Sequence, residues 1–256
     1  MKKIIFSVIY LAPLLLSAQQ DSIISQVYQW KQPVKSLQGN TRSTILFEGS
    51  THDMEWLQMD ALELAESRAD IKMDVPAGEE NLYIVKKGIL ITTLNDSVYT
   101  LGQGSIVLLL PGQHFSIQNK ITTSCEYYVA KYRSNSPIDL QRGKDSGGSF
   151  IEDWKSIVLK PSEKGGTRNY FQRPTAMTKR LDMHVTTLNA GLKSHDPHTH
   201  RAAEMIVMIE GNTEMQIAQK FYKGIGGDVY YLGSNVLHGI RNIGSQPCTY
   251  FAIQFE

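Results

Sequence analysis

Three histidines and one glutamate have the spacing of a metal-chelating site. His198 and His200 lie two residues apart, Glu204 follows four residues later, and His238 lies in a later segment bracketed by turn-forming Gly and Asn. Side chains at positions i and i+2 of an extended segment point to one face, and the glutamate joins them if the strand alternation resumes after a short bend. Three imidazoles and a carboxylate suit a divalent metal. We therefore predict one metal site formed by these four residues.

The rest of the chain predicts an all-β protein that positions these ligands. Short runs of Val, Ile, Leu, Thr, Tyr and Phe alternate with Gly, Asn, Asp and Pro, which is typical of a β-sandwich or barrel. We expect strands at 82–85, 89–94, 106–110, 205–209 and 250–255. In the 205–209 strand both the odd and the even positions are apolar, which predicts burial on both faces against a second barrel or a partner chain.

An internal repeat divides the chain into two copies. A gapless shift of 123 residues superimposes six pairs of identical residues, namely Gly88 and Gly211, Tyr99 and Tyr222, Gly104 and Gly227, Asn119 and Asn242, Cys125 and Cys248, and Tyr127 and Tyr250. We therefore predict two domains of one fold, 39–133 and 165–256, joined by a linker at 134–164 and preceded by an arm at 19–38. Equivalent positions in two barrels are too far apart for a disulfide, so both cysteines should be free thiols.

The same shift places no metal ligand in the first copy. His198 falls on Val75, His200 on Ala77, Glu204 on Asn81 and His238 on Phe115. His114 lies one residue out of register, which turns it to the opposite face of a strand. We therefore expect one metal per chain, bound by the second copy alone.

The first residues have the features of a secretory signal peptide. Met1-Lys-Lys is a positive start, 4–16 is an apolar run too short to span a bilayer comfortably, and Ser17-Ala18 offers a cleavage site. We expect cleavage of 1–18, an exported protein in the periplasm or medium, and no stable membrane insertion afterwards. The chain has 26 basic and 25 acidic residues, and the leader removes Lys2 and Lys3. A nearly neutral chain without a basic run excludes an electrostatic case for nucleic acid.

Two segments resemble the paired motifs of the cupin superfamily. The matching residues are Gly191, His198, His200, Glu204 and Gly211 in the first motif, and Gly227, His238 and Asn242 in the second. The chain departs from the usual pattern in a six-residue first spacer, in Gly233 where Pro is usual, and in Asn235 where Gly is usual. With two copies the chain resembles a bicupin, which implies two tandem double-stranded β-helix (jelly-roll) barrels, the first one degenerate.

The resemblance leaves several functions open. A degenerate first barrel followed by a metal-binding second one is similar to the ureidoglycine aminohydrolase group, which is manganese-dependent and releases ammonia from a small ureido amino acid. Oxalate decarboxylase-like and quercetin dioxygenase-like bicupins share the ligand set. We expect a metal-dependent enzyme acting on a small polar metabolite that carries a ureido or carboxylate group, by hydrolysis, isomerisation, decarboxylation or oxygenation. The alternative is a non-catalytic module that binds a sugar or another metabolite.

Further expectations concern the metal, the cavity and self-association. The donor set suits Mn, Fe, Co, Ni, Cu or Zn, and the resemblance to the manganese-dependent group makes Mn the expected metal. Strand alternation from Glu204 predicts that Ile206 and Met208 line the cavity floor, and we add Tyr230, Phe251 and Gln254 from other strands. No catalytic base can be identified from alternation alone. Bicupins often pair through exposed strands, so a homo-oligomer is among the expectations.

Overall fold

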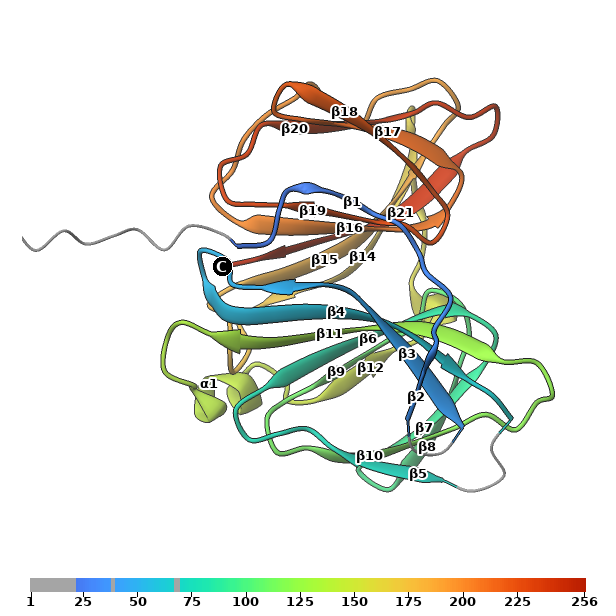
Figure 1. The fold of residues 1–256 in the computed structure, drawn as a ribbon, viewed down its shortest axis with the longest axis vertical. Helices are drawn as coiled ribbons and strands as arrows, with labels where there is room; N and C mark the ends of the chain where they lie inside the picture. Colours follow the sequence, from blue (N-terminus) through green and yellow to red (C-terminus); the bar gives the residue numbers. More distant parts are fainter. Residues whose placement is uncertain (1–21, 38–39, 67–69) are drawn as a thin grey trace, which may run out of the picture.

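The computed structural model describes residues 22–37, 40–66 and 70–256 and consists almost entirely of β-strands in two similar halves. The signal peptide expected at 1–18 lies outside the described residues. Each half consists of a large seven-stranded sheet and a smaller sheet, and the two large sheets face each other in the middle of the molecule (Figure 1). No helix among the described residues is long and apolar enough to cross a membrane.

The first half contains the strands β2 to β12. Its large sheet has the order β12-β9-β6-β11-β4-β3-β2, and its small sheet has the order β5-β10-β7-β8. The strands are β2 (Lys35–Ser36), β3 (Thr41–Gly49), β4 (Met54–Leu64), β5 (Ile71–Asp74), β6 (Glu80–Lys87), β7 (Leu90–Leu94), β8 (Ser97–Leu101), β9 (Ile106–Leu109), β10 (His114–Gln118), β11 (Cys125–Ser134) and β12 (Phe150–Glu152).

The second half repeats this arrangement. Its large sheet has the order β1-β19-β16-β21-β15-β14-β13, and its small sheet has the order β18-β17-β20. The strands are β1 (Gln26–Tyr28), β13 (Lys160–Ser162), β14 (Gly165–Arg173), β15 (Leu181–Leu188), β16 (Ala203–Glu210), β17 (Asn212–Ile217), β18 (Lys220–Ile225), β19 (Val229–Leu232), β20 (His238–Asn242) and β21 (Cys248–Phe255). The double-stranded jelly-roll fold predicted from the sequence is confirmed, with each half built as two packed sheets rather than one closed barrel.

The arm and the linker attach the halves to each other. β1, in the predicted arm, pairs with β19 of the second half, so the chain adds a strand there before it builds the first half. The predicted linker contains the helix α1 (Leu140–Asp145) and the 3₁₀ turn η1 (Trp154–Ser156). It also contains β12, which pairs with β9, and β13, which pairs with β14.

Three apolar cores follow from strand alternation. One lies inside each half, and the third lies between the two large sheets. In β16, Met205 and Val207 face the core between the halves, whereas Ile206 and Met208 face the interior of the second half. This confirms the prediction that the strand is buried on both faces. The face that carries Met205 and Val207 is covered by the first half.

The residues shared by the two copies serve the backbone. Gly211 has a φ of 88°, and a Cβ there would lie 2.5 Å from the Cβ of Cys248. Asn242 donates its side-chain amide to the carbonyls of Leu188 and Gln246, as Asn119 does to those of Leu64 and Thr123. Both cysteines are buried and free, as predicted. The repeat therefore preserves turns and strand packing, and the chemistry must come from residues that it does not share.

Candidate metal centre

The structure brings the predicted ligands together at the open end of the second half. His198 lies in the loop before β16, and its backbone pairs with that of His238 at the start of β20 through two N–H···O bonds of 3.0 Å. The ring nitrogens of these two residues and of His200 all lie within 4.8 Å of one another. Glu204, in β16, reaches them from the side, with Oε2 3.2 Å from Nε2 of His238.

Backbone carbonyls fix the tautomers of two of the histidines. Nδ1 of His200 lies 2.8 Å from the carbonyl oxygen of Ala202, and Nδ1 of His238 lies 2.8 Å from that of Val236. Because a carbonyl only accepts hydrogen bonds, each Nδ1 must carry the proton. Each Nε2 then carries a lone pair and faces Glu204, and Nε2 of His200 also lies 3.4 Å from the side-chain amide of Gln254. This is the arrangement in which a metal-binding imidazole is held by its second nitrogen.

An unsatisfied buried nitrogen supports the fit of a metal ion. Nε2 of His238 is buried and has no hydrogen-bond partner, since its contact with Glu204 at 3.2 Å lacks hydrogen-bonding geometry. Nε2 of His200 lies 3.6 Å from the same carboxylate oxygen. A buried polar atom without a partner is costly, and a cation placed between these groups would satisfy it. The residues present therefore fit a divalent metal.

The electrostatics of the centre favour an ionised Glu204 and a neutral His198, whereas the contact with Glu204 raises the pKa of His200. Burial alone would raise the pKa of Glu204, but contacts with His200, His238 and Gln254 outweigh it and lower the pKa to about 2. Burial and the neighbouring imidazoles of His195, His238 and His200 lower the pKa of His198. A negative carboxylate and a neutral imidazole are the forms that bind a metal.

A cavity of about 260 Å³ opens beside the ligands. Ile206 and Gln254 line it, as predicted from the sequence, and Gln254 donates from Nε2 to Oε1 of Glu204 at 3.2 Å. Met208 and Tyr230 face the same interior but pack in its apolar core, and the hydroxyl groups of Tyr230 and Thr213 lie 3.1 Å apart. These two residues have the predicted face but do not line the cavity.

Phe251 requires a correction. It lies on the opposite face of β21, fully buried in the core between the two halves, where its ring lies 5.3 Å from that of Tyr170. Alternation along β21 places Tyr250, Ala252 and Gln254 on the cavity side instead. Phe251 therefore belongs to the contact between the halves and not to the site.

Several cavity residues were not predicted as site residues. The hydroxyl of Tyr250 is hydrogen-bonded to Ser194 and Thr186, and all three line the cavity together with His184 and His195. Tyr250 has the same strand parity as Gln254, which is the signal that could have identified it. His184 pairs with Ala252 across β15 and β21. His195 lies in the loop before His198, with its ring 4.2 Å from that ligand.

In the first half other residues replace the ligands, and aromatic side chains fill the place of the metal centre. Strand pairing makes Asn81 and Phe115 the equivalents of Glu204 and His238, as the shift predicted. It places Met73 opposite Phe115, however, so the gapless match of His198 to Val75 was two residues out. The rings of Phe115 and Tyr83 pack edge to face at 5.4 Å where the second half has its ligands.

The comparisons with known proteins agree with this fold. Residues 184–254 match the family model described as a cupin domain. The structure is similar to AerE from Microcystis aeruginosa, with 14% identity and a TM-score of 0.66 over 88% of this chain and 96% of that one. It is similar to the protein Ylba from E. coli, with 13% identity and a TM-score of 0.68 over 94% and 96% of the two chains.

A third similar structure is an oxalate decarboxylase from Lactobacillus farciminis in complex with formate. The identity is 12% and the TM-score 0.64, over 91% of this chain and 86% of that one. No curated protein matches the sequence. The fold and the three-histidine centre define a protein with two cupin-type halves and one candidate metal site. Residues 184–254, in the second half, match a cupin domain, and the similar structures share the fold over most of the chain.

Proposed function

We propose that this chain is an exported, metal-dependent enzyme of the bicupin type that acts on a small polar metabolite. The proposal rests on one observation, the convergence of the Nε2 atoms of His200 and His238 with His198 and the ionised Glu204. A divalent metal held there, Mn being favoured, supplies an open position that acts as a Lewis acid or activates water or dioxygen. The remaining chemistry belongs to the residues of the cavity.

The cavity residues suit a small metabolite with a polar end and a short apolar part. At about 260 Å³ the cavity lies below the range of about 300–1,000 Å³ found for drug-sized ligands. The hydroxyls of Tyr250, Ser194 and Thr186 can bind polar atoms of the substrate, while Ile206 and Met215 offer an apolar floor. A ureido or carboxylate group bound at the centre meets these requirements, and hydrolysis or decarboxylation of such a molecule is the reaction class we propose.

Metal analysis tests the centre directly. We expect the wild-type protein to hold about one metal ion per chain. The His200→Ala variant should hold far less, because the loss of one of the four ligands weakens metal binding strongly. The matched control is His114→Ala, which removes an exposed histidine of the first half with a side chain that is 86% accessible. Full occupancy in the His200→Ala variant would refute the ligand assignment.

Turnover assays then test the enzyme function. The metal-loaded protein should release ammonia from a small ureido acid or carbon dioxide from a small carboxylic acid, and the His200→Ala variant should not. Oxygen uptake would assign the alternative of a dioxygenase. Tight metabolite binding without turnover would assign the non-catalytic binding module instead. Recovery from the periplasm or medium of a chain that begins near Gln19 tests export.

A further inference from the structure

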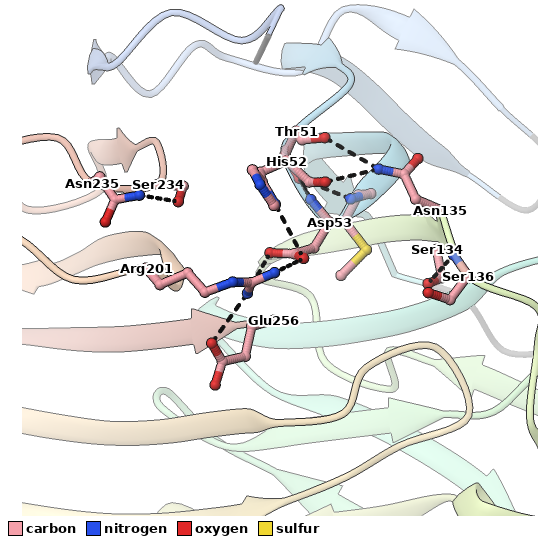
Figure 2. Close-up of polar contacts among 11 residues, drawn as sticks. Thr51, His52, Asp53, Ser134, Asn135, Ser136, Arg201, Ser234, Asn235 and Glu256 are labelled. Carbon is pink, nitrogen blue, oxygen red and sulfur yellow. Dashed lines mark hydrogen bonds and ion pairs between the residues drawn. The ribbon is translucent and has the colours of Figure 1, made fainter. Parts of the chain in front are cut away.

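An ion-pair cluster connects the loop that carries His200 to the first half. Arg201, between His200 and Ala202, donates from Nη2 to Oδ1 of Asp53 at 2.8 Å and from Nη1 to Oδ2 at 3.2 Å. Its Nη1 also donates to Oε2 of Glu256 at 3.2 Å. Figure 2 shows the Arg201 side chain extended from the second half toward both carboxylates. A two-pronged contact of this kind fixes the direction of the guanidinium as well as its distance.

Asp53 lies in a turn that is itself well held. The turn lies between β3 and β4, and Oγ1 of the buried Thr51 accepts the N–H groups of Asp53 and Met54 at 3.3 and 3.0 Å. Asn135 donates its backbone N–H to the carbonyl of Asp53 at 3.0 Å and its side-chain amide to that of His52, also at 3.0 Å (Figure 2). The first half therefore presents the carboxylate of Asp53 at a fixed place.

The peptide segment around Arg201 also holds the ligand imidazole. The carbonyl of His200 accepts the N–H of Asn235 at 2.8 Å, and the carbonyl of Ala202 accepts Nδ1–H of His200 at 2.8 Å. Arg201 lies between these two residues, so its ion pairs with Asp53 and Glu256 hold the same backbone segment. Metal–ligand distances tolerate deviations of only about 0.2 Å.

We propose that the ligand-free first half serves the metal centre as a positioning element, through Asp53 acting on Arg201. This inference rests on the proposed metal site and adds a role for the half that cannot bind metal itself. Asp53 and Arg201 are positioning residues, since neither side chain is among the residues that line the cavity beside the ligands.

The test compares metal affinity in Asp53→Ala with that in a matched control. The control is Glu79→Ala, because Glu79 pairs with Arg133 at 2.8 Å and has a side chain 13% exposed, against 16% for Asp53. The two cationic partners are also alike, at 46% exposed for Arg133 and 51% for Arg201. Both variants lose an arginine–carboxylate pair at the surface, with two contacts to Arg201 for Asp53 and one to Arg133 for Glu79, but only the Asp53 pair includes a neighbour of a ligand.

We expect Mn²⁺ affinity, measured by competition with a chelator, to fall by about tenfold in Asp53→Ala and to change less than twofold in Glu79→Ala, since partners of metal ligands contribute about 10- to 100-fold. Asp53→Glu should restore part of the loss. The double variant Asp53→Ala/Arg201→Ala should bind Mn²⁺ no more weakly than the single variant Arg201→Ala, because Asp53 acts through Arg201. The thermal unfolding of the two single variants without metal should be similar.

Two results would overturn the inference. Wild-type affinity in Asp53→Ala contradicts it, and so does an equal loss in both single variants, which would mean that any ion-pair loss weakens the fold in general. A wild-type protein that binds no Mn²⁺ overturns the proposed metal centre together with this inference. A wild-type protein that binds Mn²⁺ with an unaffected Asp53→Ala variant overturns the inference alone.

Discussion

Glu80 is a carboxyl group buried where the two halves meet, and its protonation should affect the stability of the whole molecule. It is fully buried, with Oε1 accepting the hydroxyl of Tyr132 at 2.9 Å and Oε2 accepting the N–H of Met177 at 3.0 Å. Burial raises the pKa of Glu80 from 4.5 to about 7, because hydrogen bonds and the charge of Arg173 offset only part of the lost hydration. The folded state thus binds this proton more tightly than the unfolded chain does.

The sign of the pH effect follows from this difference. Below the unfolded pKa both states are protonated and Glu80 imposes no penalty. As the pH rises toward the folded pKa, the unfolded chain ionises first, so the free energy of unfolding falls. A shift of about 2.5 units corresponds to a loss of about 3 kcal/mol between roughly pH 4.5 and pH 7, after which the contribution is constant.

The variant that isolates this effect is Glu80→Gln, because an amide has the shape of the protonated acid and no proton to lose. Its Nε2 cannot accept a hydrogen bond as a carboxyl oxygen does, but that loss is the same at every pH. Urea unfolding of the wild type and the variant at several values between pH 5 and pH 8, with chelator present to remove any metal, gives the difference between their unfolding free energies. We expect this difference to move by about 2–3 kcal/mol in favour of the variant as the pH rises. A change below about 1 kcal/mol would show that the folded protein tolerates the charge and that the burial argument fails.

Two further predictions concern stability, one for the core between the halves and one for a buried ion pair of the first half. Phe251→Ala should lower the free energy of unfolding by about 3–4 kcal/mol while the folded variant keeps its metal, since Phe251 is fully buried and faces away from the cavity; urea unfolding and metal analysis check this, and a loss below 1 kcal/mol would contradict it. Lys131→Met should cost about 3 kcal/mol, because it leaves Asp60, 4% exposed and 2.6 Å from the Lys131 ammonium, without its counter-charge. Asp60→Asn in the same chain should recover most of that loss, and a Lys131→Met variant as stable as the wild type would disprove the pairing.

The ligands could be predicted from the sequence because their geometry is local. His198 and His200 are two residues apart, and the bend before Glu204 restores the alternation that brings the carboxylate to the same side. His238 required the second motif of the family, since nothing in the sequence alone states that β20 lies beside the loop of His198. The bridge between His198 and His238 supplies that contact in the structure.

The cavity wall could be predicted only in part. Strand parity tells which residues share a face, but it does not tell which face points inward or whether a side chain reaches the cavity. Along β21 Phe251 and Gln254 have opposite parity, so they cannot both face the interior, and Phe251 was assigned to the wrong face. Met208 and Tyr230 were given the right face, but their side chains pack in the apolar core, although their strand partners Tyr250 and Ile206 line the cavity. The equivalence of His198 with Val75 failed because the segment before the second-half ligands and β5 differ by two residues in register, which a gapless shift cannot represent.

The internal repeat separates residues that maintain the fold from residues that do chemistry. Gly211 and Asn242 belong to the family motifs, yet their equivalents Gly88 and Asn119 make the same backbone contacts in a half without ligands. These motif residues therefore maintain turns. Equivalent positions that carry different residues in the two copies, such as Glu204 and Asn81, account for the difference in chemistry. By the same reasoning Gln254, which contacts Glu204 and has Lys131 as its equivalent, belongs with the metal centre and not with the scaffold.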